Sequence, residues 1–113
     1  MRLARASLMV AELKAFSAGG GSVLFGTDVG YTDHYDTAFE FELMGRAGLD
    51  FRAILRALTT TPAARFASAR RSGQVRAGYD ADVTILSADP STDVRNFARV
   101  RYTIVGGRFI YGR

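Results

Sequence analysis

The sequence predicts an α/β fold that is incomplete by itself. Helical periodicity dominates the first two thirds of the chain, where residues 22–26 provide a single predicted strand of the buried, parallel kind. Residues 100–111 instead alternate as an antiparallel hairpin does. Because one parallel strand cannot form a sheet, we expect the chain to lack strands that its helical part needs.

The first predicted element is a helix over residues 2–18, since apolar side chains recur there at intervals of three or four. These side chains are Leu3, Ala6, Met9, Val10, Leu13 and Phe16. The glycine run at 19–21 ends this helix. The apolar run Val23–Phe25 then predicts the strand over 22–26, covered on both faces.

Three further helices are expected before residue 70. The first covers 37–47, with Asp36 or Thr37 as its cap and Gly48 after its end. The second follows a cap at Asp50, and its inner face carries Phe51, Ile54, Leu55 and Leu58.

A short third helix is predicted to start at Thr61–Pro62, with threonine at the cap and proline in the first turn. We expect it to fade after Ala69.

Antiparallel strands are predicted in the last part of the chain. Residues 83–86 form a short apolar run, and residues 100–111 alternate on both sides of the pair Gly106–Gly107. A glycine pair between alternating segments is typical of a two-residue hairpin turn. Asp80 and Asp82 are interpreted as turn and cap residues.

Composition excludes several classes of function. The 113 residues suit one domain, and the absence of cysteine excludes disulfides and thiolate metal sites. The net charge of +4 comes from 14 scattered arginines and one lysine, so we expect no nucleic-acid partner. No apolar run approaches the ~20 residues of a membrane span, and the amino-terminal residues lack a signal core. We therefore expect no membrane partner and a cytoplasmic location.

The stretch "SVLFGTDVG", residues 22–30, contains the candidate catalytic residue Asp28. An apolar strand that ends on a carboxylate permits two interpretations. Asp28 either opens a turn, as aspartate commonly does, or is held at the mouth of a strand for chemistry. The polar, aromatic loop that follows contains Tyr31, Asp33, His34 and Tyr35, which are candidates for contact with a substrate.

Four motifs occur in an order that resembles the carboxyl-terminal part of metal-dependent amidohydrolases of the imidazolonepropionase and prolidase-like type. They are "FGTDVG" at 25–30, "EFELMGRAGLDFRAILRALTTTPAARF" at 40–66, "SGQVRAGYDADVTILSADP" at 72–90 and the final "VRYTIVGGRFIY". Each motif is weak alone, but the ordered set covers nearly the whole chain.

The resemblance implies a fold. Such enzymes combine a (β/α)8 barrel with a small β-sandwich that both ends of the chain build. Residues 1–70 are then expected to supply the last βα unit of the barrel and the helices after it. Residues 71–113 are expected to supply the carboxyl-terminal strands of the composite β-domain.

The resemblance also implies an activity, the hydrolysis of carbon–nitrogen bonds in non-peptide or cyclic amides by metal-activated water. Asp28 matches the family's aspartate that binds the metal and accepts the proton of the water. The expected cofactor of a complete enzyme is a divalent metal, with zinc the expected ion, and the expected partner is a small-molecule amide substrate.

The chain departs from the family pattern in its metal ligands. It has one histidine, His34, and no His-x-His motif, whereas a catalytic metal needs about three protein ligands. We therefore expect no tightly bound metal and no activity in this chain alone. The alternative is a non-catalytic module that assembles with another chain or self-associates through exposed strand edges.

Overall fold

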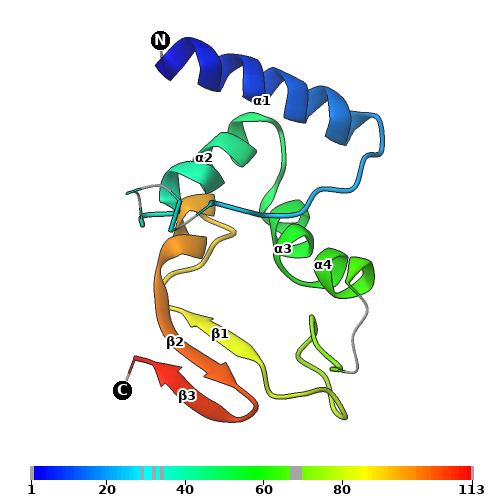
Figure 1. The fold of residues 1–113 in the computed structure, drawn as a ribbon, viewed down its shortest axis with the longest axis vertical. Helices are drawn as coiled ribbons and strands as arrows, with labels where there is room; N and C mark the ends of the chain where they lie inside the picture. The colour runs from blue at the N-terminus through cyan, green and yellow to red at the C-terminus, as the bar shows by residue number, and fades with distance from the viewer. Residues whose placement is uncertain (1, 29, 32, 34, 67–69, 113) are drawn as a thin grey trace.

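The computed structural model describes residues 2–28, 30–31, 33, 35–66 and 70–112, and shows helices stacked on one end of a small sheet (Figure 1). The helical part consists of α1 (Arg2–Ala18), α2 (Ala38–Arg46), α3 (Phe51–Leu58) and α4 (Thr60–Arg65). After it come β1 (Val83–Leu86), the 3₁₀ helix η1 (Val94–Ala98), β2 (Val100–Val105) and β3 (Arg108–Tyr111). None of the described helices is long and apolar enough to cross a lipid bilayer.

The hydrophobic core lies where α2, α3 and η1 meet. Its buried side chains are Phe41, Met44, Ala47, Leu49, Ile54, Ala57 and Phe97. The ring of Phe97 from η1 packs against the ring of Phe41 from α2, with 5.3 Å between centroids. The short helix η1 therefore joins the sheet to the helical part, and Figure 1 shows it directly below α2.

The caps predicted for α2 and α3 are confirmed. The Asp36 carboxylate accepts a hydrogen bond from the Ala38 N–H at 2.9 Å, and the Asp50 carboxylate accepts one from the Ala53 N–H at 2.8 Å. Side-chain oxygens at these positions satisfy N–H groups that have no partner inside the helix. Gly48 follows α2 with φ of +90°, a conformation that glycine adopts at little steric cost.

The predicted start of α4 was wrong. The helix begins at Thr60, so Thr59 occupies the cap position and Pro62 is the third helical residue. The Thr59 hydroxyl donates to the carbonyl of Leu55, at 2.6 Å, instead of capping α4. The chain consequently passes from α3 into α4 through one residue, and α4 ends at Arg65, earlier than the predicted fading after Ala69.

The predicted strand over 22–26 was also wrong. These residues form no strand, although their exposure alternates as it does along one. The inward side chains Val23 and Phe25 pack against the core. A strand requires hydrogen bonds to a neighbour, and the one backbone bond described for this segment runs from the Phe25 N–H to the Ala57 carbonyl, at 3.2 Å.

The sheet matches its prediction. β1, β2 and β3 lie side by side in that order and are antiparallel, with Val83 opposite Ile104 and Ile104 opposite Phe109. Gly106 and Gly107 connect β2 to β3 with φ of +55° and +78°. Positive φ at both positions is the requirement of a type I′ hairpin turn, which matches the twist of the two strands.

Asp82 anchors this hairpin turn to the end of the helical part. Its carboxylate accepts a hydrogen bond from the Gly106 N–H at 2.8 Å and pairs with the Arg70 guanidinium at 2.6 Å. The hydrogen bond from Arg70, reinforced by the one from Gly106, lowers the pKa of the Asp82 carboxyl below its usual range. Asp82 therefore caps no helix, and instead it links the hairpin turn to Arg70 through a hydrogen bond and an ion pair.

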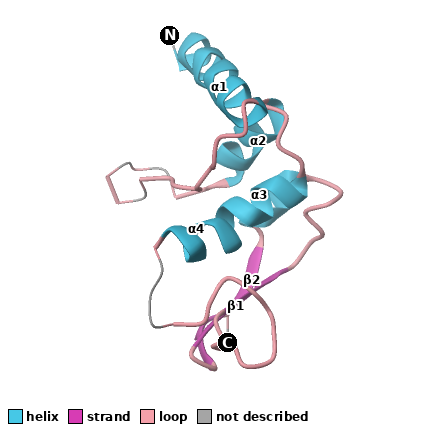
Figure 2. Ribbon diagram, turned by 90° about the vertical axis from the view of Figure 1, so that its right-hand side faces the viewer, coloured by secondary structure: helices cyan, strands magenta, loops and turns pink. Residues whose placement is uncertain are grey.

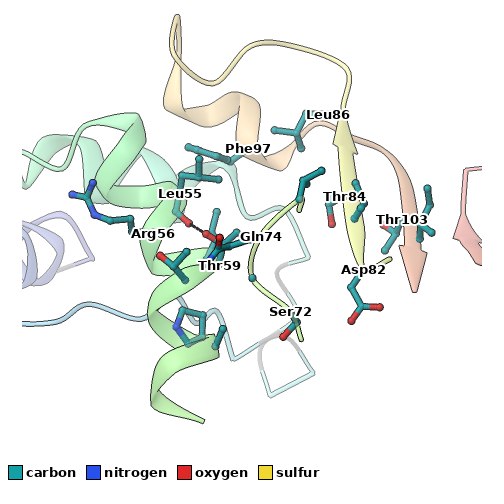
Figure 3. A pocket seen from close by; sticks show the side chains of 18 of the residues that line it. Leu55, Arg56, Thr59, Ser72, Gln74, Asp82, Thr84, Leu86, Phe97 and Thr103 are labelled. Atoms are coloured by element: carbon teal, nitrogen blue, oxygen red, sulfur yellow. Dashed lines mark hydrogen bonds between the residues drawn. The ribbon is translucent and has the colours of Figure 1, made fainter. Parts of the chain in front are cut away.

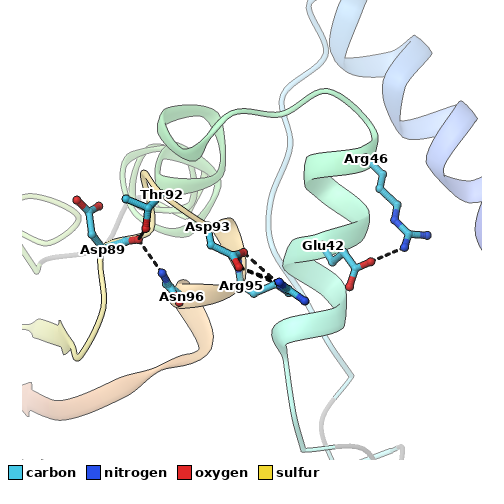
Figure 4. A network of polar contacts seen from close by, with 7 residues as sticks. All are labelled: Glu42, Arg46, Asp89, Thr92, Asp93, Arg95 and Asn96. Carbon is cyan, nitrogen blue, oxygen red and sulfur yellow. Dashed lines mark hydrogen bonds and ion pairs between the residues drawn. The ribbon is translucent and has the colours of Figure 1, made fainter.

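Polar contacts shape the turn between β1 and η1 (Figure 4). The Asn96 side-chain amide donates to the Asp89 carbonyl at 2.8 Å. The Asp93 carboxylate caps η1 by accepting from the Arg95 N–H at 2.9 Å. These contacts hold η1 in the orientation that directs Phe97 into the core.

We expect Ile54→Ala to destabilise the chain strongly, because the Ile54 side chain is completely buried. Removal of a buried isoleucine side chain to alanine costs about 2–5 kcal/mol. Urea unfolding followed by circular dichroism measures the change. The control is Leu55→Ala on the same helix, since Leu55 is 45% exposed and should cost far less. Equal losses of unfolding free energy in the two variants would contradict the described core.

Acid should weaken the Asp82 anchor. Because the folded pKa of Asp82 lies below its unfolded value, its contribution to stability is present above the unfolded pKa and is lost as pH falls through the folded pKa. The difference in unfolding midpoint between wild type and Asp82→Asn should therefore be largest at neutral pH and shrink below about pH 3.9. Glu12→Gln leaves the anchor intact and should keep the wild-type pH dependence. If the difference in unfolding midpoint between wild type and Asp82→Asn did not change with pH, the ion pair would not be the source of the lost stability.

Candidate functional site

The extended segment 22–28 carries the candidate catalytic residue at its end. The Phe25 ring stacks on the Phe41 ring with 4.6 Å between centroids and 7° between planes. Together with the bond from the Phe25 N–H to Ala57, this stack fixes the segment against α2 and α3. The packing thereby determines where Asp28 lies, three residues beyond the anchored ring.

Asp28 has an unusual backbone conformation. Its φ is +51°, and no other non-glycine residue in the described part of the chain has positive φ. The Asp28 carbonyl accepts a hydrogen bond from the Tyr31 N–H at 2.9 Å, which closes a turn. Aspartate tolerates this left-handed region better than most residues, and such residues are frequent at functional sites. Asp28 therefore does open a turn, while its side chain remains exposed to solvent.

The described candidate residues in the loop after Asp28 are exposed to solvent. Tyr31 is 93% exposed and Tyr35 is 73% exposed, and Asp33 is exposed as well. His34 lies outside the described residues, so the structure does not test its predicted contact with a substrate. The described candidates do not converge on a common cavity.

The described residues do not fit a metal centre on their own. No group of three or more histidine, cysteine, aspartate or glutamate side chains comes together among them. Asp28 could contribute one oxygen ligand, whereas catalytic zinc is usually held by three protein ligands. Any further ligands would have to come from outside the described part of this chain.

The structure has a groove that the sequence did not predict (Figure 3). It has a volume of about 1060 Å³ and lies between α3–α4 on one side and β1–β2 on the other. Leu55, Leu58, Leu86 and Val105 line it, and Asp28 does not. Periodicity could have identified Leu55 as apolar on a helix surface, but only the fold shows that the sheet stands opposite.

A smaller cavity lies beside the extended segment. It has a volume of about 400 Å³ and is lined by Ser22, Leu24, Thr61, Ala64 and Arg65. Ser22 and Leu24 are on the outward side of the segment, opposite the face that packs on the core. The outer side of segment 22–28 therefore remains uncovered.

Comparison with known proteins identifies the family. Residues 3–111 match the family described as the Amidohydrolase family. The chain belongs to the amidohydrolase family. The resemblance inferred from the four motifs is thereby confirmed. A curated amidohydrolase, tasK of Hapsidospora irregularis, is 40% identical over 43 residues, which are 38% of this chain and 4% of tasK.

Solved structures show the same fold over most of this chain. A Xaa-Pro dipeptidase with bound methionine aligns with 91% of this amidohydrolase chain and 25% of its own, at a TM-score of 0.80 and 24% identity. The ochratoxinase of A. niger aligns with 91% of this chain and 24% of its own, at a TM-score of 0.73 and 28% identity.

These matches confirm the expected fold class, part of a hydrolase barrel followed by antiparallel strands of the β-domain. The chain spans about a quarter of the length of each of these two structures. The remaining three quarters of those folds have no counterpart among the residues of this chain.

The purified amidohydrolase chain should not retain zinc. One carboxylate ligand is too few for tight binding, so dialysis against zinc followed by metal analysis should give much less than one ion per chain. Asp28→Asn serves as the comparison and should give the same content. A content of one zinc ion per chain that is lost in Asp28→Asn would show that the chain has more metal ligands than the described residues indicate.

Proposed function

We propose that this chain supplies the last barrel segment and the closing β-strands of an amidohydrolase that cleaves the carbon–nitrogen bond of a small amide. The observation that carries the proposal is the family match over residues 3–111, combined with the position of Asp28 at the end of the anchored segment 22–28. A carboxylate that is exposed at the end of a segment packed on the core suits a residue that handles a proton.

In this proposal Asp28 accepts a proton from the attacking water and returns it to the leaving nitrogen. Such proton transfer contributes about 10²–10⁴-fold to the rate. The family implies a divalent metal, for which zinc is the expected ion and which activates water when it is bound. Because the described residues do not form its site, the assembled enzyme would provide the other ligands.

The proposed substrates are amides of small molecules. Cyclic or other non-peptide amides were the expectation from sequence. The name of the similar Xaa-Pro dipeptidase extends the proposed substrates to dipeptides that end in proline. The exposed loop residues Tyr31, Asp33 and Tyr35, together with His34, are proposed to line the substrate side of the completed site, because loops at this end of a barrel bind substrate.

A second candidate function is a non-catalytic module that completes a fold supplied by another chain. The observation that favours it is the shortage of metal ligands among the described residues. Exposed apolar side chains on the sheet, such as Phe109, Ile110 and Tyr111, also suit association with a partner or with further copies. Turnover that requires Asp28 within an assembled barrel would favour the enzyme over this alternative.

A chimeric enzyme tests the proposal. Residues 3–111 would replace the aligned quarter of the Xaa-Pro dipeptidase, and hydrolysis of a Xaa-Pro dipeptide and of a cyclic amide would be measured. We expect turnover in the chimera and none in the 113-residue chain alone. Asp28→Asn in the chimera should lower kcat at least about 10²-fold, because it removes the proton acceptor.

The matched control is Asp36→Asn, which makes the same charge change eight residues away. Asparagine caps helices about as well as aspartate, so this variant should keep both the α2 cap and the activity. Circular dichroism would establish that each chimera folds. A folded chimera that keeps full turnover with Asp28→Asn would refute the assignment of Asp28. Asp28-dependent turnover of the isolated chain would refute the view that it is incomplete.

A further inference from the structure

The turn that begins at Asp28 contains a glycine with positive φ. The Asp28 carbonyl accepts the hydrogen bond from the Tyr31 N–H at 2.9 Å, so the turn ends at Tyr31. Gly30 is its third residue, with φ of +99°. Turn types with positive φ at the third position are dominated by glycine, because a Cβ in this conformation crowds the backbone.

Gly30 is required for its backbone conformation and not for its small size. A Cβ at this position would meet no atom of the described residues within 4 Å. A larger side chain therefore has room, and only the positive φ opposes it. An L-residue at positive φ is destabilising, whereas a D-residue favours this conformation. The handedness of residue 30 can thus be changed without crowding a described neighbour.

Asp28 also lies in the left-handed region, although it carries a side chain. Its φ is +51°, and an L-residue keeps such a conformation only where the surrounding structure holds it. On one side the chain is held at Phe25, whose ring stacks on Phe41 and whose N–H forms a backbone hydrogen bond. On the other side the turn bond from Tyr31 holds it.

The φ of Asp28 determines the direction of its carboxylate. When φ changes, the Cβ atom turns about the N–Cα bond, while the chain before Asp28 stays anchored at Phe25. A return from +51° to the extended value of about −120° would carry the carboxylate to the opposite side of this bond. A general base works only within hydrogen-bond reach of the proton that it accepts. Loss of the turn would therefore move the Asp28 carboxylate away from that proton.

We propose that Gly30 is a positioning residue for Asp28 in the assembled amidohydrolase. The positive φ of Gly30 closes the turn, the bond from Tyr31 then holds Asp28 in its left-handed conformation, and this conformation directs the carboxylate toward the reacting water. The inference rests on the proposed role of Asp28 in proton transfer. Gly30 has no side chain to take part in the chemistry, so it acts through Asp28 alone.

NMR of the 113-residue chain tests the turn itself. The amide proton and the α-proton of one residue lie closer together at positive φ than in the extended region, so Asp28 should give a strong nuclear Overhauser effect between them. Gly30→Ala should remove this strong signal, and D-alanine at position 30 should keep it. Chemical ligation through a temporary cysteine in place of Ala38 would introduce the D-residue, since the chain has no cysteine of its own. A strong signal in Gly30→Ala would overturn the proposal.

The matched control is Gly20→Ala. Gly20 has φ of +85°, and a Cβ there would likewise meet no described atom within 4 Å. It follows α1 and lies outside the turn, so the substitution introduces the same kind of backbone strain elsewhere. The Asp28 signal should be unchanged in this variant. Its loss would overturn the proposal, because the conformation of Asp28 would then depend on general stability and not on the turn at Gly30.

A double-mutant cycle in the chimeric enzyme tests the catalytic consequence. Gly30→Ala should lower kcat at least about tenfold with little change in KM, which is part of the 10²–10⁴-fold that a general base contributes. In the Asp28→Asn background it should lower kcat no further, because two changes that act through one group are not additive. Equal losses in both backgrounds would make Gly30 merely structural and overturn the proposal.

Failure of this inference and failure of the proposed function give different results. If Asp28→Asn lowered kcat but Gly30→Ala in a folded chimera did not, Asp28 would keep its role and only the positioning by Gly30 would be refuted. If Asp28→Asn alone kept full turnover, the proposed function would be refuted, and with it the inference, since Asp28 would have no proton transfer for Gly30 to support.

Discussion

The packing of Phe41 between two other aromatic rings is the interaction on which the rest of the structure depends. Phe25 stacks on Phe41 in nearly parallel orientation, and Phe97 meets it at a 38° tilt. Three parts of the chain that are distant in sequence thus share one contact: the extended segment, α2 and the helix before β2. Aromatic pairs of this kind add about 0.5–1.5 kcal/mol each to the burial of their surfaces. They hold segment 22–28 and η1, which leads into the sheet, against the same helix, α2.

The hairpin and segment 22–28 differ in where their hydrogen-bond partners lie along the sequence. The hairpin forms completely, because its hydrogen bonds are local and its glycine turn needs no partner. A parallel strand gains its hydrogen bonds only from neighbours that are distant in sequence. Segment 22–28 therefore keeps the side-chain alternation of a strand without its ladder. Figure 2 shows the consequence, since the trace before α2 runs past the helices as a loop and the strands are confined to the far end.

Asp28 and the groove differ in how many of the groups around them the described residues provide. Asp28 has a left-handed backbone conformation, in a turn closed by the bond from Tyr31. Its chemistry, however, requires groups that the described residues do not provide. The groove instead is lined by side chains of α3, α4, β1 and β2 that are all present in the described structure. The chain spans about a quarter of the length of the two solved structures that it resembles in fold.

The sequence by itself determined the elements whose stabilising contacts are local. The helices over 2–18 and after Asp50, the hairpin at Gly106–Gly107 and the family motifs were all readable, because caps, turns and periodicity act over a few residues. Tertiary structure decided the rest. The segment 22–26, predicted as a strand, is an extended coil. Helix α4 begins at Thr60, after the Thr59 hydroxyl bonds to the Leu55 carbonyl. The helix η1 forms where no signal was recognised in the sequence. Tertiary structure also created the groove, since two surfaces from distant parts of the chain enclose a cavity only after the core around Phe41 brings them together.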